Sequence, residues 1–248
     1  MTRIISLNVK IFADGADLDG IRKLAQNPLI EGFTTNPTLM RKAGISDYAA
    51  FAKDMLGVID GAPVSFEVFA DELDEMEVQA LEIASWGDNV YVKIPITNTK
   101  GDSSVSLVER LSAQKVQVNV TAMMTLDQVR HVAEALDAKT PAVVSVFAGR
   151  IADTGLDPMP LMREAVGILE SRPKAKLLWA SPRELLNIFH ADEVGCHIIT
   201  VTHDLLGKLS GVGKDLDQFS LETVRMFYDD ASAAGYTIAT DEKTAATG

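Results

Sequence analysis

The chain has 248 residues, 47% of them hydrophobic, so it can bury a core large enough for one α/β domain or for two small domains. Its formal net charge of -12 at pH 7 disfavours nonspecific binding to nucleic acid, which needs a positively charged surface. The single cysteine excludes an intrachain disulfide, and no Cys/His cluster has ligand spacing, so no metal site is predicted.

A membrane partner is not expected either. A membrane helix needs ~20 consecutive apolar residues, and no run in the sequence approaches this length. The apolar stretch within the opening Met1–Lys10 is too short for a secretory signal. We therefore expect a cytoplasmic protein.

Short β-branched runs alternate with longer helical patterns about eight times, with no linker-like composition between the repeats. The predicted strands are, in chain order, Lys10–Asp14, Gly32–Asn36, Val64–Phe69, Val90–Pro95, Val116–Thr121, Ala142–Phe147, Lys176–Ser181 and His197–Val201. The count, the order and the chain length favour a (β/α)₈ TIM barrel. A doubly wound sheet is disfavoured because the glycine fingerprint that usually follows its first strand is missing.

We predict a single α/β domain over residues 1–248. The barrel is expected over about residues 10–210, followed by an extra C-terminal helix over about 219–234 and a polar tail over 235–248.

Lys93 stands inside the apolar strand Val90–Pro95, where a buried ammonium is costly unless its charge is relieved or used. A lysine in a region of low dielectric loses its proton more readily, and the neutral amine can attack a carbonyl to form a Schiff base. Taken alone, Lys93 could also be an edge-strand lysine that reaches solvent along its aliphatic stem.

Other polar residues share the expected inward faces of the strands. Side chains alternate between the two faces of a strand, and the faces opposite to these residues are apolar. A barrel interior is normally filled by branched apolar residues, so a polar set late in the strands predicts a site at the face where barrel active sites form. This set consists of Glu67, Lys93, Asn119, Thr121 and Ser145.

Several motifs together resemble the transaldolase family of class I aldolases. The two leading motifs are Gly32-Phe33-Thr34-Thr35-Asn36-Pro37-Thr38-Leu39 and Val92-Lys93-Ile94-Pro95. The others, in the expected order, are Phe12-Ala13-Asp14, Asn119-Val120-Thr121, Ser145-Val146-Phe147-Ala148-Gly149-Arg150 and Ala180-Ser181-Pro182-Arg183. The resemblance extends from about Lys10 to Leu209.

The resemblance implies a catalytic role for four residues. Lys93 would form the Schiff base with a ketose phosphate, and Asp14 would be the acid/base carboxylate. Glu67 and Thr121 would position the water that takes part in carbinolamine formation and breakdown. No cofactor is implied, because the lysine itself supplies the electron sink.

The resemblance also implies binding residues for sugar-phosphate substrates. Those expected to bind the sugar are Asn36, Asn119, Ser145 and Phe147. Those expected to bind phosphate are Arg150, Ser181 and Arg183.

The implied activity is that of a transaldolase, which transfers a dihydroxyacetone unit between sugar phosphates, as in the pentose phosphate pathway. The alternative within the family is a fructose-6-phosphate aldolase that releases dihydroxyacetone. Members that are transferases carry Glu and Phe where these aldolases carry Gln and Tyr, and Glu67 and Phe147 therefore favour the transferase. A sugar-phosphate binding barrel without turnover is a third possibility.

A homo-oligomer is also expected, because the short chain with an extra C-terminal helix resembles the small, ring-forming members of the family. Leu221, Val224 and Phe227 lie at helical spacing in that helix. They could pack on a neighbouring copy or on their own barrel.

Overall fold

The computed structural model describes residues 7–238, in which eight parallel strands form a closed barrel in the order β1 to β8. The strands are β1 (Lys10–Asp14), β2 (Ile30–Thr34), β3 (Val64–Glu67), β4 (Val90–Pro95), β5 (Val118–Met123), β6 (Ala142–Val146), β7 (Ala175–Trp179) and β8 (Ile198–Thr202). Each strand pairs with the next, and β1 pairs with β8 to close the barrel. The predicted (β/α)₈ fold is confirmed.

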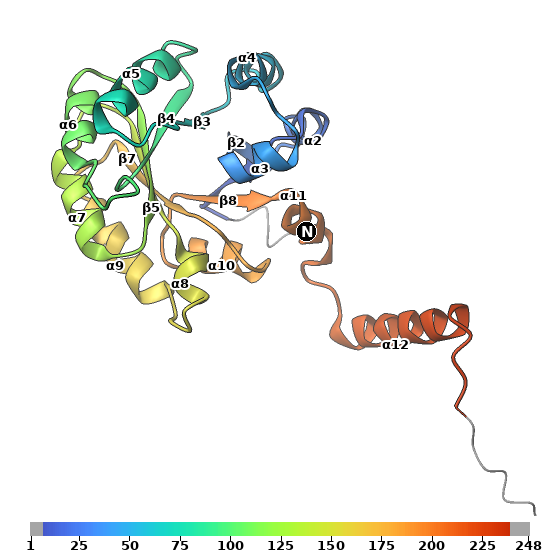
Figure 1. The fold of residues 1–248 in the computed structure, drawn as a ribbon. Helices are drawn as coiled ribbons and strands as arrows, with labels where there is room; N and C mark the ends of the chain where they lie inside the picture. Colours follow the sequence, from blue (N-terminus) through green and yellow to red (C-terminus); the bar gives the residue numbers. More distant parts are fainter. Residues whose placement is uncertain (1–6, 239–248) are drawn as a thin grey trace, which may run out of the picture.

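The helices follow the strands along the chain, and α5, α6, α7 and α9 form an arc outside the barrel in Figure 1. The helices are α2 (Leu18–Leu24), α3 (Pro37–Lys42), α4 (Tyr48–Val58), α5 (Leu73–Ala84), α6 (Val105–Ala113), α7 (Leu126–Ala135), α8 (Ala148–Ala152), α9 (Met159–Leu169), α10 (Leu186–Glu193), α11 (His203–Leu206), the 3₁₀ helix η1 (Gly207–Gly211) and α12 (Leu216–Ala233).

The bounds of β1 and β4 agree with the prediction, as do the starts of β3 and β6, while the remaining strand ends were wrong by one or two residues. Strand β2 ends at Thr34 because the Asn36 side chain caps α3 by accepting the Leu39 N–H, so the chain leaves the strand there. Strand β5 begins at Val118 because the N–H of Val116 instead bonds to the last turn of α6. Local hydrogen bonds of this kind decide strand ends that a β-branched pattern leaves open.

One apolar layer lies on each side of the barrel's strands. The larger layer lies between strands and helices and includes Phe33, Val64 and Phe66, which point outward from β2 and β3. The smaller layer fills the barrel interior; its buried members are Phe12, Val143, Leu178, Ala180 and Ile198, packed by Tyr91 and Phe147. Gly32 makes room for this interior packing, since a Cβ there would lie 2.5 Å from the Phe12 ring.

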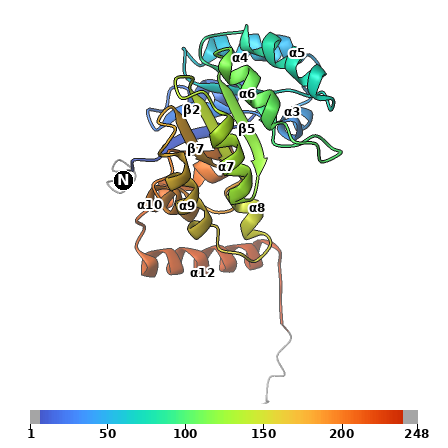
Figure 2. The same cartoon turned by 90° about the vertical axis from the view of Figure 1, so that its left-hand side faces the viewer.

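The extra C-terminal helix is present as α12, over Leu216–Ala233 rather than 219–234. It has no buried residue, and Val224 and Phe227 are 61% and 63% exposed. Figures 1 and 2 show it standing apart from the barrel, so its apolar side chains do not pack on their own barrel. Most of the predicted tail, residues 239–248, lies outside the described residues, as do residues 1–6.

Within residues 7–238, no helix is long and apolar enough to cross a membrane. The same residues contain no group of three or more His, Cys, Asp or Glu side chains placed to hold a metal ion.

Candidate active site

The candidate site is a cavity of about 420 Å³ at the carboxyl ends of the barrel strands. This is the face that carries the active site in TIM-barrel enzymes. The cavity is lined by every residue for which the sequence predicted a role, namely Asp14, Asn36, Glu67, Lys93, Asn119, Thr121, Ser145, Phe147, Arg150, Ser181 and Arg183. A second cavity of about 420 Å³ lies at the opposite end, beside Lys10, Tyr91 and Lys176, and none of the predicted site residues lines it.

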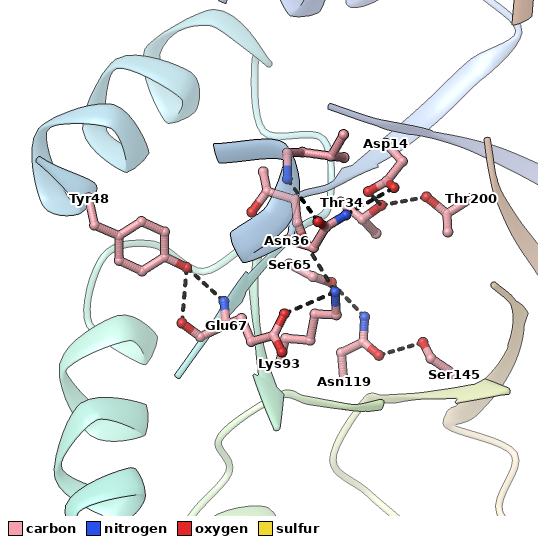
Figure 3. Close-up of polar contacts among 12 residues, drawn as sticks. Asp14, Thr34, Asn36, Tyr48, Ser65, Glu67, Lys93, Asn119, Ser145 and Thr200 are labelled. Carbon is pink, nitrogen blue, oxygen red and sulfur yellow. Dashed lines mark hydrogen bonds and ion pairs between the residues drawn. The ribbon is translucent and has the colours of Figure 1, made fainter. Parts of the chain in front are cut away.

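Lys93 points from β4 into this cavity and is only 8% exposed. Its Nζ donates to the carbonyl of Thr35 at 3.0 Å and lies 3.2 Å from Oε2 of Glu67, as Figure 3 shows. The pairing of β3 with β4 sets Glu67 opposite Lys93 and so brings the two side chains together. The lysine is therefore buried beside a carboxylate, and it does not extend into solvent.

Asp14 ends β1 opposite Thr34 of β2. Its carboxylate accepts from Thr34 Oγ1 at 2.8 Å and from Asn36 Nδ2 at 3.3 Å, and the Thr34 hydroxyl also contacts that of Thr200. Burial raises the pKa of Asp14, and this effect is opposed by the charge of Lys93 and by the hydrogen bond from Thr34. A carboxyl group with a raised pKa is suited to take up and return a proton.

A chain of hydrogen bonds fixes the amide of Asn119 inside the barrel. Ser145 Oγ donates to Asn119 Oδ1 at 2.6 Å, and Asn119 Nδ2 donates to Ser65 Oγ at 2.9 Å. All three side chains are buried. Because both ends of the amide are engaged, Asn119 is held in one orientation at the cavity wall.

Thr121 lies at an irregular point of β5. The pairing with β6 shifts between Val120 and Met123, and Ala122 has a positive φ of 63°, a backbone conformation found more often at functional sites. The buried Oγ1 of Thr121 has no hydrogen-bond partner among residues 7–238. A buried hydroxyl normally has a partner, so a water or a substrate hydroxyl would suit this position.

The loop after β7 and the start of α8 meet at the cavity. A Cβ on Gly149 would lie 1.5 Å from the carbonyl oxygen of Ser181, so only glycine permits this approach. Ser181 itself has a positive φ of 58°. The contact sets the two segments that carry Arg150 and Arg183 next to each other, and both arginines line the cavity.

The two arginines differ in their partners. Arg183 binds Asp153 through both its Nε, at 3.0 Å from Oδ1, and its Nη2. Arg150 has no ion pair with any described residue, and its guanidinium carbon lies 5.7 Å from the Phe147 ring centroid. Arg150 is thus the cation with its charge free for an anionic ligand, whereas Arg183 is held in place by a carboxylate.

The sequence did not identify Thr34, Thr200, Ser65 or Tyr48 as site residues. The threonines and Ser65 could have been found from strand parity, because they lie on the inward faces of their strands. Tyr48 lies on α4, and nothing in the sequence pattern indicates that its hydroxyl bonds to the backbone of Glu67.

The family model described as "Transaldolase/Fructose-6-phosphate aldolase" matches residues 11–245. The chain belongs to this family. It is 34% identical to "Probable transaldolase 2" of Listeria monocytogenes over 81% of this chain and 88% of that protein. It is also 34% identical to "Probable transaldolase" of Streptococcus agalactiae over 85% of this chain and 99% of that protein. The predicted family and the prediction of an enzyme are confirmed.

Solved structures similar to this chain share its fold at low sequence identity. KGPDC from Streptococcus mutans is 9% identical, with a TM-score of 0.52 over 79% of this chain and 88% of that one. A 2,3-dimethylmalate lyase is 13% identical, with a TM-score of 0.55 over 98% of this chain and 89% of that one. These similarities support the barrel fold alone.

Proposed function

We propose that this enzyme transfers a dihydroxyacetone unit from a ketose phosphate, such as fructose 6-phosphate or sedoheptulose 7-phosphate, to an aldose phosphate, through a Schiff base on Lys93. The observation that carries the proposal is the buried amine of Lys93, 3.2 Å from Glu67, in the cavity that Asp14 also lines. A binding protein would gain nothing from burying a lysine in this way.

In the first step, Lys93 gives its ammonium proton to Glu67, and the resulting neutral amine attacks the C2 carbonyl of the ketose phosphate to form a carbinolamine. Loss of water then gives the iminium. Glu67 is suited to move the protons of this step, because its carboxylate is the group beside Nζ. Thr121 is suited to hold the water, since it lines the same cavity and its hydroxyl has no other partner among residues 7–238.

In the second step, Asp14 takes the proton of the C4 hydroxyl and the C3–C4 bond breaks. The bonding electrons move into the iminium, which becomes an enamine, and an aldose phosphate leaves. Thr34 and Asn36 hold the Asp14 carboxylate in place for this step by their hydrogen bonds. The enamine then attacks the carbonyl carbon of the acceptor aldehyde, Asp14 returns the proton to its oxygen, and hydrolysis frees Lys93.

The polar wall of the cavity would select the substrate. Asn36, Asn119 and Ser145 would bind its hydroxyl groups, and a buried site of this kind rejects analogues that lack them. Arg150, Ser181 and Arg183 would bind the phosphate, with Arg150 contributing the unpaired charge.

Phe147 and Glu67 favour transfer over simple cleavage. A tyrosine hydroxyl in place of Phe147 could protonate the enamine and release dihydroxyacetone, whereas the phenyl ring has no proton to give. The test is incubation with fructose 6-phosphate alone and with added erythrose 4-phosphate as acceptor. A transferase forms glyceraldehyde 3-phosphate continuously only with the acceptor, and steady formation without it would identify a lyase.

We further propose that the enzyme is a cytoplasmic homo-oligomer in which α12 packs on a neighbouring copy. The helix carries Leu221, Val224, Met226 and Phe227 with at least two fifths of each side chain exposed. A group of large apolar side chains exposed on one helix is unfavourable in water and is typical of a contact surface.

A further inference from the structure

The backbone of Glu67 lacks a strand partner on the β2 side. Strands β2 and β3 pair only at Phe33 with Val64 and at Thr34 with Ser65, and the last hydrogen bond between them joins Thr35 N–H to Ser65 C=O at 3.4 Å. Beyond this point the chain turns away into α3. The next N–H and C=O that point to this side belong to Glu67, and buried backbone groups require partners.

The hydroxyl of Tyr48 replaces the missing strand. The Glu67 N–H donates to Tyr48 Oη at 2.7 Å, and the Tyr48 hydroxyl donates to the Glu67 C=O at 3.1 Å, as Figure 3 shows. On the opposite side, the N–H of Val68 donates to the carbonyl of Lys93 at 3.1 Å. The backbone at Glu67 is therefore fixed from both sides, by β4 and by a single phenol.

The ring of Tyr48 is itself held in place. Its centroid lies 4.6 Å from that of Phe69, 5.6 Å from that of Trp86 and 6.1 Å from that of Phe66. Burial raises the pKa of Tyr48, so the hydroxyl keeps the proton that it donates to Glu67. The aromatic cluster thus provides a rigid support for one polar atom.

We propose that Tyr48 is a positioning residue that holds the Glu67 carboxylate beside the amine of Lys93. This inference rests on the proposed Schiff-base function, in which Glu67 moves protons during carbinolamine formation and breakdown. Tyr48 does not line the cavity, so it acts only through Glu67. The Glu67 to Lys93 contact is 3.2 Å, and proton transfer depends steeply on such a distance.

The test is the variant Tyr48→Phe, which keeps the ring and removes the hydroxyl. We expect kcat to fall between about 10-fold and about 100-fold, with KM for the ketose phosphate changed less than about twofold. The matched control is Tyr91→Phe, because Tyr91 is also a partly buried phenol in the barrel but its hydroxyl bonds to no residue within 7–238. Its kcat should equal that of the wild type.

A double-mutant cycle separates positioning from a general structural effect. If Tyr48 acts through Glu67, Tyr48→Phe will not lower kcat further in a Glu67→Gln background. If the two residues act independently, the fold-losses in kcat of the single variants will multiply in the double variant. Unchanged kcat in Tyr48→Phe, multiplied losses in the cycle, or loss of the near-ultraviolet dichroism of the folded chain would each overturn the inference. A wild-type enzyme that forms no borohydride-trapped adduct on Lys93 would instead contradict the proposed function.

Discussion

Replacing Lys93 by methionine measures how much the buried ion pair contributes to the fold, separately from its role in turnover. The change keeps an unbranched side chain, one atom shorter, and removes the cation beside Glu67, whose side chain is only 17% exposed. Removing one partner of a fully buried pair costs ~3–5 kcal/mol, and the residual exposure of Glu67 lowers this to about 2–3 kcal/mol. Domains are typically stable by ~5–15 kcal/mol, so Lys93→Met should fold and lose all turnover.

The assay is urea unfolding followed by tryptophan fluorescence, which reports on Trp179, completely buried, and on Trp86. The matched control is the double variant Lys93→Met, Glu67→Gln, which has no uncompensated carboxylate at this position and should recover most of the lost stability. The reasoning is refuted if Lys93→Met unfolds at the same urea concentration as the wild type with an unchanged slope. It is also refuted if the second substitution restores nothing.

Four further changes test other parts of the site. Burial raises the pKa of Asp14 in the folded chain above its ordinary value of 3.8. At a pH between the unfolded and the folded pKa, the folded chain therefore binds more protons than the unfolded chain, and the free energy of unfolding falls as pH rises. Asp14→Asn should therefore abolish turnover yet unfold at a higher temperature than the wild type at about pH 8, with no such gain at about pH 3; equal shifts at both pH values would contradict this. Arg150→Ala should raise KM for fructose 6-phosphate about tenfold or more and leave kcat/KM for unphosphorylated fructose unchanged, and parallel losses for both sugars would argue against phosphate binding. Glu67→Gln combined with Phe147→Tyr should shift the products toward free dihydroxyacetone, and an unchanged product ratio would count against the roles given to these residues. Phe227→Glu on α12 should lower the particle mass measured by light scattering, and an unchanged mass would exclude this face as the contact.

The sequence allowed the fold to be predicted because each strand reads as a short β-branched run between helical patterns. It could not give every strand end. Asn36 continues a strand-like pattern, but its side chain caps α3 and so ends β2 two residues earlier than predicted. Such ends depend on hydrogen bonds between a side chain and a nearby backbone group, which compete with the strand ladder.

Strand parity brought the predicted polar residues to one cavity because it depends only on alternation along each strand. Contacts made by residues on helices and loops could not be predicted from alternation along the strands. The hydroxyl of Tyr48 reaches Glu67 from α4, and Asp153 reaches Arg183 from the end of α8. Both depend on how a helix packs on the barrel, and residue spacing in the sequence does not encode this packing.

The central claim is a Schiff base on Lys93, and borohydride reduction in the presence of fructose 6-phosphate tests it most directly. Reduction converts the iminium to a stable secondary amine, and intact mass followed by peptide mapping locates it. The account predicts one dihydroxyacetone-derived adduct per chain, on Lys93, and none in Lys93→Met. An adduct on a different lysine, or no adduct in a wild-type enzyme that turns this substrate over, would contradict it.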